Sequence, residues 1–305
     1  MNDTLRIATR KSALALWQAN HVRDLLLEAH PRIEIELVKI VTRGDRILDR
    51  PLAEIGGKGL FLKELERAML DGQADLAVHS MKDVPAAMAD GLVLQAVLPR
   101  ANPFDALVSR DGRPLAELPA GSRIGTSSLR RRSQLLAVRP DLMVEDLRGN
   151  VDTRLRKLDE GQYDAIILAC AGLERLGLGE RINETLRPPD FLPASTQGII
   201  GLQCRQDDAA TQALIEPLAD VDTMAVASAE RAVANVLEAT CQVPLAAHAV
   251  LSNGKVRLEA MVGTPDGAQG VSAAGEAPAA QAVQLGERIA AELLENGAGE
   301  IMANL

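Results

Sequence analysis

Short apolar runs alternate with helix-type patterns through the first two hundred residues of the chain. Strands are expected over 5–9, 33–41 and 75–79, where apolar residues gather in runs of strand length. Helices are expected from Ser12, a good N-capping residue, to about His30, and again over 61–70. Strands that alternate with helices in this way are typical of βαβ units on a mostly parallel sheet.

The same alternation starts again after Pro103. Further strands are expected over 106–109, 123–126, 143–147 and 164–169, with helices between them. The apolar run 198–204 predicts one more strand, which we expect to return to the first sheet. Two similar α/β lobes with a cleft between them would result.

The pattern of hydrophobic and polar residues changes at about residue 217. Helices are expected over 223–237 and 279–296. Between them, apolar and polar residues alternate from Val256 to Val262, which predicts a half-buried strand. Turn sequences at Asn253-Gly254 and Pro265-Asp266-Gly267 predict hairpins, and Gly297 is suited to end the last helix. This part of the chain is therefore expected to be a small α+β domain with an antiparallel sheet.

These changes of pattern divide the chain into three expected domains. They are a first α/β lobe of residues 1–98 with 199–216, a second α/β lobe of 99–198, and an α+β domain of 217–305. A chain of 305 residues is too long for one ordinary hydrophobic core, which favours several domains. The predicted fold class is α/β, with two doubly wound lobes and a C-terminal α+β domain.

Composition excludes several classes of function. Aromatic residues make up only 2% of the chain, which argues against a base-stacking surface, and the net charge of −9 disfavours duplex binding. No apolar run is long enough to span a bilayer. Cys170, Cys204 and Cys241 form no CxxC pair, so neither a disulfide framework nor a metal site is expected. We expect a cytoplasmic monomer that binds neither nucleic acid nor membrane.

One segment carries charge of the opposite sign to the whole chain. Residues 121–157 contain eight arginines and Lys157 against four acids. Such a reversal marks a place where an anion binds, and arginine grips carboxylates with two parallel hydrogen bonds. Ser127 or Ser128 would cap the helix that carries Arg130, Arg131 and Arg132, at the carboxyl end of an expected strand. The alternative is a solvated basic helix face.

Asp83 and Cys241 are the candidate reactive residues. Asp83 follows the expected strand 75–79, beside Lys82, where a carboxylate can stabilise a cation or move a proton. The alternative for Asp83 is an ordinary turn residue before Val84-Pro85. Cys241 lies in an expected loop, where a thiol facing basic groups would become a nucleophile. A glycine-rich segment over 42–59 is either a mobile lid or an ordinary loop.

Six short segments together resemble the porphobilinogen deaminase (hydroxymethylbilane synthase) family, over essentially the whole chain. They are Arg6–Ser12, Gly56–Phe61, His79–Pro85, Gly125–Arg131, Leu147–Val151 and Cys241–Pro244. Each segment alone is a weak signal, and six in the same order are a strong one. The resemblance implies two periplasmic-binding-protein-like lobes and an α+β domain that carries a cofactor cysteine.

The resemblance also implies an activity and a set of site residues. The family condenses four porphobilinogen molecules, with loss of ammonia, into hydroxymethylbilane on a dipyrromethane cofactor, whose thioether link maps to Cys241. Asp83 corresponds to the catalytic carboxylate, and Asp45 and Lys58 fall in the lid segment. The residues implied to bind cofactor and substrate are Arg10, Ser12, Lys82, Thr126, Ser128, Arg130, Arg131, Arg148, Arg154 and Arg175.

The chain departs from the family pattern at several positions. Ala239-Thr240 stands where the family usually has Gly-Gly, and Ser195-Thr196 and Gln203 also differ from the usual residues. Phe104 takes the place of an arginine typical of close relatives. The alternatives to the deaminase are a catalytically impaired paralogue and a small polycarboxylate-binding protein on the same fold.

Overall fold

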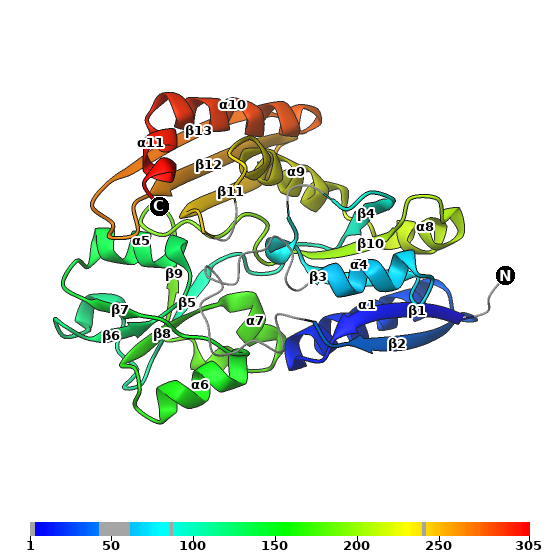
Figure 1. Ribbon diagram of the computed structural model, residues 1–305, viewed down its shortest axis with the longest axis horizontal. Helices are drawn as coiled ribbons and strands as arrows, with labels where there is room; N and C mark the ends of the chain where they lie inside the picture. The colour runs from blue at the N-terminus through cyan, green and yellow to red at the C-terminus, as the bar shows by residue number, and fades with distance from the viewer. Residues whose placement is uncertain (1–3, 43–61, 86–87, 240–241) are drawn as a thin grey trace. The chain divides into compact units, whose positions relative to one another are not determined.

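This computed structural model describes residues 4–42, 62–85, 88–239 and 242–305 (Figure 1). The chain forms two compact units, Met1–Ala101 with Ile199–Met224, and Asn102–Gly198 with Ala225–Leu305. The division into three domains with the boundaries given above stays a prediction.

The first unit is built on a five-stranded sheet with the order β2-β1-β3-β10-β4. Strands β1, β2 and β3 run parallel, whereas β10 is antiparallel to both of its neighbours. The elements of this unit are β1 (Thr4–Arg10), α1 (Ala13–Ala29), β2 (Glu34–Ile40), α4 (Lys63–Leu70), β3 (Leu76–Ser80), η1 (Met81–Asp83), β4 (Leu92–Val97), β10 (Ile200–Arg205), α8 (Ala209–Ile215) and η4 (Glu216–Leu218). The expected return of 198–204 to the first sheet is thus confirmed, while β4 was not among the predicted strands.

Both faces of this sheet are buried, as a doubly wound lobe requires. On one face, Ile7 and Val78 pack with Val22 and Leu26 of α1. On the other face, the smaller residues Ala8 and Ala77 pack against Leu65, Ala68 and Met69 of α4. Ser12 caps α1 as predicted, because its hydroxyl accepts a hydrogen bond of 3.3 Å from the amide of Ala15.

The second unit begins with another five-stranded sheet, of order β7-β6-β8-β5-β9. Strands β6, β7 and β8 are parallel, and β5 is antiparallel to β8. The elements are β5 (Asp105–Ser109), η2 (Leu115–Glu117), β6 (Arg123–Gly125), α5 (Leu129–Val138), β7 (Met143–Glu145), α6 (Val151–Asp159), β8 (Ala165–Ala169), α7 (Cys170–Arg175), η3 (Gly179–Arg181) and β9 (Glu184–Leu186). In Figure 1, α5 lies on one face of this sheet and α6 and α7 lie on the other.

The C-terminal part of the second unit is α+β, as predicted. An antiparallel sheet of order β11-β12-β13 is covered by α10, which crosses it in Figure 1. The elements are α9 (Val221–Val236), β11 (Leu245–Ser252), β12 (Lys255–Gly263), β13 (Gly270–Pro278), η5 (Ala279–Gln281), α10 (Ala282–Glu295) and α11 (Ala298–Ala303). The alternation in β12 is confirmed, since Val256, Leu258, Ala260 and Val262 are all buried. Together with the two five-stranded lobes, this sheet confirms the predicted fold class.

Among the described helices, α1 is the longest, and it carries several polar side chains. Among the residues that the structure describes, no helix combines the length and the apolar content that crossing a bilayer requires.

Candidate active site

The predicted site residues of the first unit gather at one edge of its sheet. Arg10 ends β1 and Ser12 caps α1, while Lys82 and Asp83 lie in η1, directly after β3. Because β1 and β3 are parallel neighbours, their carboxyl ends meet at the same edge. Lys82 and Asp83 are exposed and Arg10 is half-buried, so these charged groups face solvent at the strand ends.

The strand end before Asp83 is braced from α1. Gln18, which is buried on that helix, donates a hydrogen bond of 2.8 Å from Nε2 to the hydroxyl of Ser80. The amide of Met81 also donates to the carbonyl of Ile199 at 3.0 Å. These contacts hold the backbone that presents Asp83, and they are formed by side chains and segments far away in sequence.

The predicted site residues of the second unit also follow three parallel strands. Thr126 and Ser128 come after β6, Arg148 follows β7, and Arg175 ends α7, which begins directly after β8. Arg154 lies in α6, the helix that follows β7. The carboxyl ends of neighbouring parallel strands lie at one edge, so the sequence motifs of this unit come together there.

Ser128, rather than Ser127, caps the arginine-bearing helix α5. Its hydroxyl accepts a hydrogen bond of 3.4 Å from the amide of Arg131. The hydroxyl of Ser127 donates instead to the carbonyl of Leu147 at 3.1 Å. Thr126 is buried, and its hydroxyl oxygen accepts from the amide of Ser128 at 3.2 Å. The two hydroxyl residues predicted for this turn therefore shape the start of α5.

Arg130 and Arg131 do not lie on a solvated helix face. Both are buried and share the carboxylate of Asp105, the first residue of β5. Arg131 donates to Oδ1 of Asp105 from Nε at 3.0 Å and from Nη2 at 2.6 Å, and Nη1 of Arg130 lies 2.7 Å from Oδ2. Arg132, the third arginine of this run, is exposed.

Backbone carbonyls fix the same two guanidiniums from the other side. Nη1 of Arg130 donates to the carbonyl of Leu192 and Nη1 of Arg131 to that of Ile167, each at 2.7 Å. Burial would raise the pKa of Asp105, but the charges of Arg130 and Arg131 outweigh it and hold that pKa well below its usual range. Burial lowers the pKa of Arg130.

Arg154 and Arg175 are held by backbone carbonyls near the same edge. Nε of Arg154 donates to the carbonyl of Gly149 at 2.7 Å, and Nη2 of Arg175 donates to that of Gly198 at 2.8 Å. Burial lowers the pKa of Arg175 to about 10, against the favourable charge of Glu174. An additional anionic partner would stabilise the charged form of a guanidinium whose pKa burial has lowered.

Gly149 makes the turn between Arg148 and Asn150 possible. Its φ is +115°, and a Cβ at this position would lie 2.8 Å from the side chain of Thr153. A side chain is therefore excluded both by backbone conformation and by space. The Arg148-Gly149-Asn150 motif has a physical reason here, because the turn sets the start of α6 and accepts from Arg154.

Several residues around the site were not predicted from sequence. Asp105 is the clearest case, and its only signal was an acid at the start of the apolar strand Asp105–Ser109. Gln197 donates from Nε2 to Asp105 Oδ1 at 3.1 Å and to the carbonyl of Pro103 at 2.7 Å. Glu230, fully buried in α9, accepts from the amides of Thr196 and Ala249 at 2.5 and 2.6 Å.

The cysteines and the lid segment have different outcomes. Cys170 and Cys204 are buried, and burial raises the pKa of each thiol to about 11. His79 is also buried. Cys241, Asp45 and Lys58 lie outside the described residues, so their assigned roles stay predictions.

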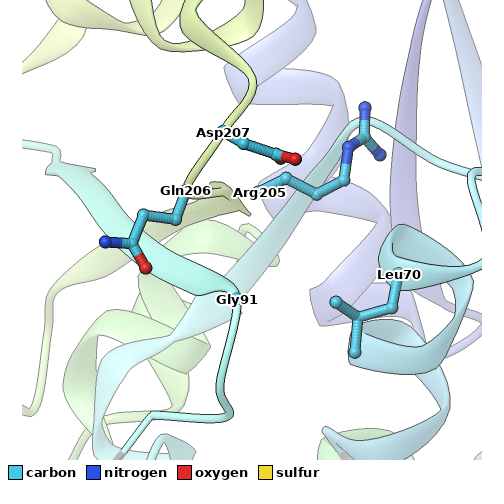
Figure 2. Close-up of a pocket in the computed structure, with 5 residues that line it drawn as sticks. All are labelled: Leu70, Gly91, Arg205, Gln206 and Asp207. Atoms are coloured by element: carbon cyan, nitrogen blue, oxygen red, sulfur yellow. The ribbon is translucent and has the colours of Figure 1, made fainter.

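A shallow pocket in the first unit is not a candidate site. It is lined by Leu70, Gly91, Arg205, Gln206 and Asp207 (Figure 2). Arg205 ends the antiparallel strand β10, so the pocket lies at the sheet edge opposite to Asp83. The guanidinium of Arg205 is bound to Asp208, Asp75 and the carbonyls of Met69 and Ala74, which gives it a structural role.

Fold and site together define an α/β protein with basic side chains at the carboxyl edges of its parallel strands. Residues 5–213 match the family model described as porphobilinogen deaminase, dipyromethane cofactor binding domain, and residues 224–295 match that of the porphobilinogen deaminase C-terminal domain. The chain belongs to the porphobilinogen deaminase family. The enzyme that defines this family is a transferase that builds hydroxymethylbilane.

Among solved structures, the chain is similar to periplasmic domains of other proteins. One is the periplasmic VFT2 domain of BvgS from Bordetella pertussis, with 15% identity over 70% of this chain and 86% of that chain, at a TM-score of 0.41. Another is the periplasmic aliphatic sulphonate binding protein SsuA from Escherichia coli, with 17% identity over 78% of this chain and 71% of that chain, at a TM-score of 0.41.

The positive charges of the described residues fit a dipyrromethane cofactor. The matched domain is the one named for binding it, and such a group carries acetate and propionate side chains. Two buried guanidiniums share one carboxylate at Asp105, which leaves a net positive charge in that cluster. The lowered pKa of Arg175 points in the same direction, because an anion would relieve it.

Proposed function

We propose that this chain is an active porphobilinogen deaminase. It condenses four porphobilinogen molecules, with loss of ammonia, into hydroxymethylbilane on a dipyrromethane primer joined by a thioether to Cys241. The observation that carries the proposal is the match of both family domains, in order, over residues 5–213 and 224–295. The basic side chains at the strand ends support it, since each pyrrole unit brings two carboxylates. No observation favours an impaired paralogue or a simple polycarboxylate-binding protein.

Asp83 is proposed as the catalytic carboxylate. When porphobilinogen loses ammonia it becomes a cation, and an ionised carboxylate beside that cation lowers the barrier to its formation. Asp83 is exposed at a strand end that Gln18 and Ile199 brace, so its carboxylate is within reach of a substrate and its backbone is held. The same carboxylate is suited to accept the proton that the pyrrole ring releases.

The basic residues are proposed to bind the carboxylates of cofactor and substrate. Arg10 and Lys82 act from the first unit, with Ser12 as a hydroxyl donor. From the second unit, Arg148 follows β7, while Arg154 and Arg175 lie in α6 and α7, the helices that follow β7 and β8. When bound, the cofactor would supply the free pyrrole carbon to which the first substrate ring is joined, and each later ring would be joined to the ring added before it.

Arg130 and Arg131 are proposed to bind the ligand while they stay paired with Asp105. Their guanidiniums are fixed by that carboxylate and by the carbonyls of Leu192 and Ile167. A fixed cation loses little conformational entropy when an anion binds, which favours recognition. Thr126 and Ser128 hold the turn from which these arginines project.

The chain is further proposed to act in the cytoplasm as a monomer. Widely spaced cysteines without CxxC pairing suit a reducing compartment, and Cys170 and Cys204 are buried thiols. Sedimentation of the purified protein measures its oligomeric state directly. A dimer at micromolar concentration would contradict the monomer.

The mass of the intact protein tests the proposed function. We expect an increment of two pyrrole units over the mass of the chain, located by peptide mapping on the peptide that contains Cys241. The Cys241→Ser variant is the control, and it should keep the unmodified mass. An unmodified wild-type mass that stays unchanged after incubation with porphobilinogen or preformed hydroxymethylbilane would contradict the proposal.

A further inference from the structure

A chain of hydrogen bonds runs behind the strand end that carries Asp83. His79 is buried in β3, and its Nε2 lies 2.9 Å from Oε1 of Gln203 on the neighbouring strand β10. Gln203 is fully buried, and its Nε2 donates to Oε1 of Glu66 on α4 at 3.2 Å. Neither His79 nor Gln203 has a part in the chemistry proposed above.

The carboxylate of Glu66 decides which way the amide of Gln203 points. An ionised carboxylate only accepts hydrogen bonds, whereas an amide has one donating end and one accepting end. The NH₂ group of Gln203 must therefore face Glu66, and its carbonyl oxygen must face His79. A carbonyl oxygen needs a donor, so Nε2 of His79 carries the hydrogen and Nδ1 of the neutral ring is the acceptor.

The surroundings of the ring favour its neutral form. Burial lowers the pKa of His79 to about 4, against the hydrogen bond with Gln203 and the negative charge of Asp83, which both favour the cation. From α4, Glu66 reaches the ring only through the neutral amide of Gln203. From α1, the neutral side chain of Gln18 binds the adjacent Ser80. No carboxylate among the described residues forms an ion pair with the ring, and a lone buried cation is costly.

We propose that Gln203 is a positioning residue whose amide, oriented by Glu66, holds His79 as the neutral Nε2–H tautomer. Because His79 then stays neutral as the pH changes, the charge behind the strand end that carries Asp83 stays constant. The tautomer follows from the geometry of His79, Gln203 and Glu66 alone. Its bearing on Asp83 rests on the proposed function.

Long-range ¹H–¹⁵N NMR of the full chain, labelled with ¹⁵N-histidine, tests this assignment. The protein has four histidines, and the His79→Gln variant identifies the signals of His79. We expect a protonated Nε2 and an unprotonated Nδ1 whose shifts stay constant from about pH 5.5 to about pH 8.5. An Nδ1–H tautomer, or a titration of His79 within that range, would overturn the proposal.

Two variants test the roles of the partners. In Glu66→Gln the amide of Gln203 loses the charge that orients it, so we expect a second His79 tautomer to become populated. Glu28→Gln, an exposed change on α1, is the matched control and should keep the wild-type signals. A single unchanged tautomer in Glu66→Gln would show that Glu66 does not orient the amide.

Gln203→Glu brings a carboxylate against Nε2 of His79. We expect it to raise the pKa of His79 by at least about one unit. In the active enzyme, the new charges should change the acid limb of turnover, because they lie behind the strand end that carries Asp83. An unchanged acid limb would remove the link to Asp83. A wild-type protein without turnover would refute the proposed function, while the NMR signals still decide the state of His79.

Discussion

Arg131 and Asp105 form a buried ion pair in which Nε and Nη2 of the guanidinium both donate to Oδ1, at 3.0 and 2.6 Å. Asp105 begins β5, which runs antiparallel to β8, so its start lies beside the end of that strand. Arg131 lies in the first turn of α5. The pair therefore fixes the beginning of the arginine-bearing helix to the sheet edge where the predicted binding residues gather.

Replacement of Asp105 by asparagine should strongly destabilise the second unit. The variant keeps the shape of the side chain but leaves Arg130 and Arg131 buried without their shared counter-ion. Breaking a buried pair in this way costs about 3–5 kcal/mol. Urea unfolding measures the loss. Asp141→Asn is the control, because Asp141 is exposed and a surface ion pair such as the one it forms with Arg139 contributes little to stability. Equal losses in both variants would contradict the role given to Asp105.

Low pH should destabilise the protein, because it protonates the carboxylate of Asp105. The folded-state pKa of Asp105 lies well below its unfolded value of about 3.9, so its stabilising contribution is complete above roughly pH 5. That contribution is lost as the pH falls towards the folded pKa. The pKa values of Asp75 and Asp208 are lowered as well and act in the same direction. Unfolding midpoints between about pH 7 and about pH 3 should therefore fall less steeply for Asp105→Asn than for the wild type.

A glycine in the hairpin between β12 and β13 should be irreplaceable because of its contact with α5. A Cβ on Gly267 would lie 2.4 Å from the amide nitrogen of Ala137 and 2.6 Å from the carbonyl oxygen of Ser133. Gly267→Ala therefore combines an unfavourable positive φ with overpacking against backbone, and we expect a loss of about 2–4 kcal/mol.

Gly254→Ala, in the hairpin between β11 and β12, is the matched control for Gly267→Ala. Gly254 has φ +72° against +71° for Gly267, but a Cβ there meets no atom within 4 Å. We expect a cost of about 1 kcal/mol, from backbone conformation alone. Thermal or urea unfolding of the two variants separates the two effects. Equal costs would mean that the turn does not press on α5.

Asp83→Asn should remove turnover without loss of stability. Asp83 is exposed at a strand end, so the fold does not depend on its charge. If it stabilises the substrate cation and handles the pyrrole proton, turnover should fall by about 10²–10⁴-fold. Initial rates with porphobilinogen and the melting temperature are the two measurements. Asp71→Asn, another exposed acid of the first unit, should keep both values. Near-normal turnover in Asp83→Asn would exclude Asp83 from the mechanism.

Thiol titration should count two free cysteines in the loaded protein. Cys170 and Cys204 are buried with pKa values raised to about 11, so neither should react at neutral pH while the protein is folded. Denaturation exposes both, whereas a thioether at Cys241 stays blocked. Three reactive thiols in denatured protein of full activity would contradict the covalent attachment.

Local features of the fold were predictable where one short segment decides them. The cap at Ser12, a serine cap for α5 at either Ser127 or Ser128, and the turn at Asn253-Gly254 follow from residue types whose side chains or backbone freedom suit those places. Gly297 adopts a φ of +104° as the expected end of the last long helix. Helix α11 after it was missed, because its burial of Ala298 and Ile301 depends on packing against a distant sheet.

The same division applies to the site. The sequence by itself determined the family motifs and the strand ends that carry Asp83 and Arg148, because each motif is a contiguous run of residues. Only the tertiary structure decided that Asp105 pairs with both Arg130 and Arg131, and that Gln203 faces His79. Asp105 lies 26 positions from Arg131 in the sequence, and Gln203 lies 124 positions from His79. Such contacts depend on the order and direction of strands in a sheet, which no local pattern of residues encodes.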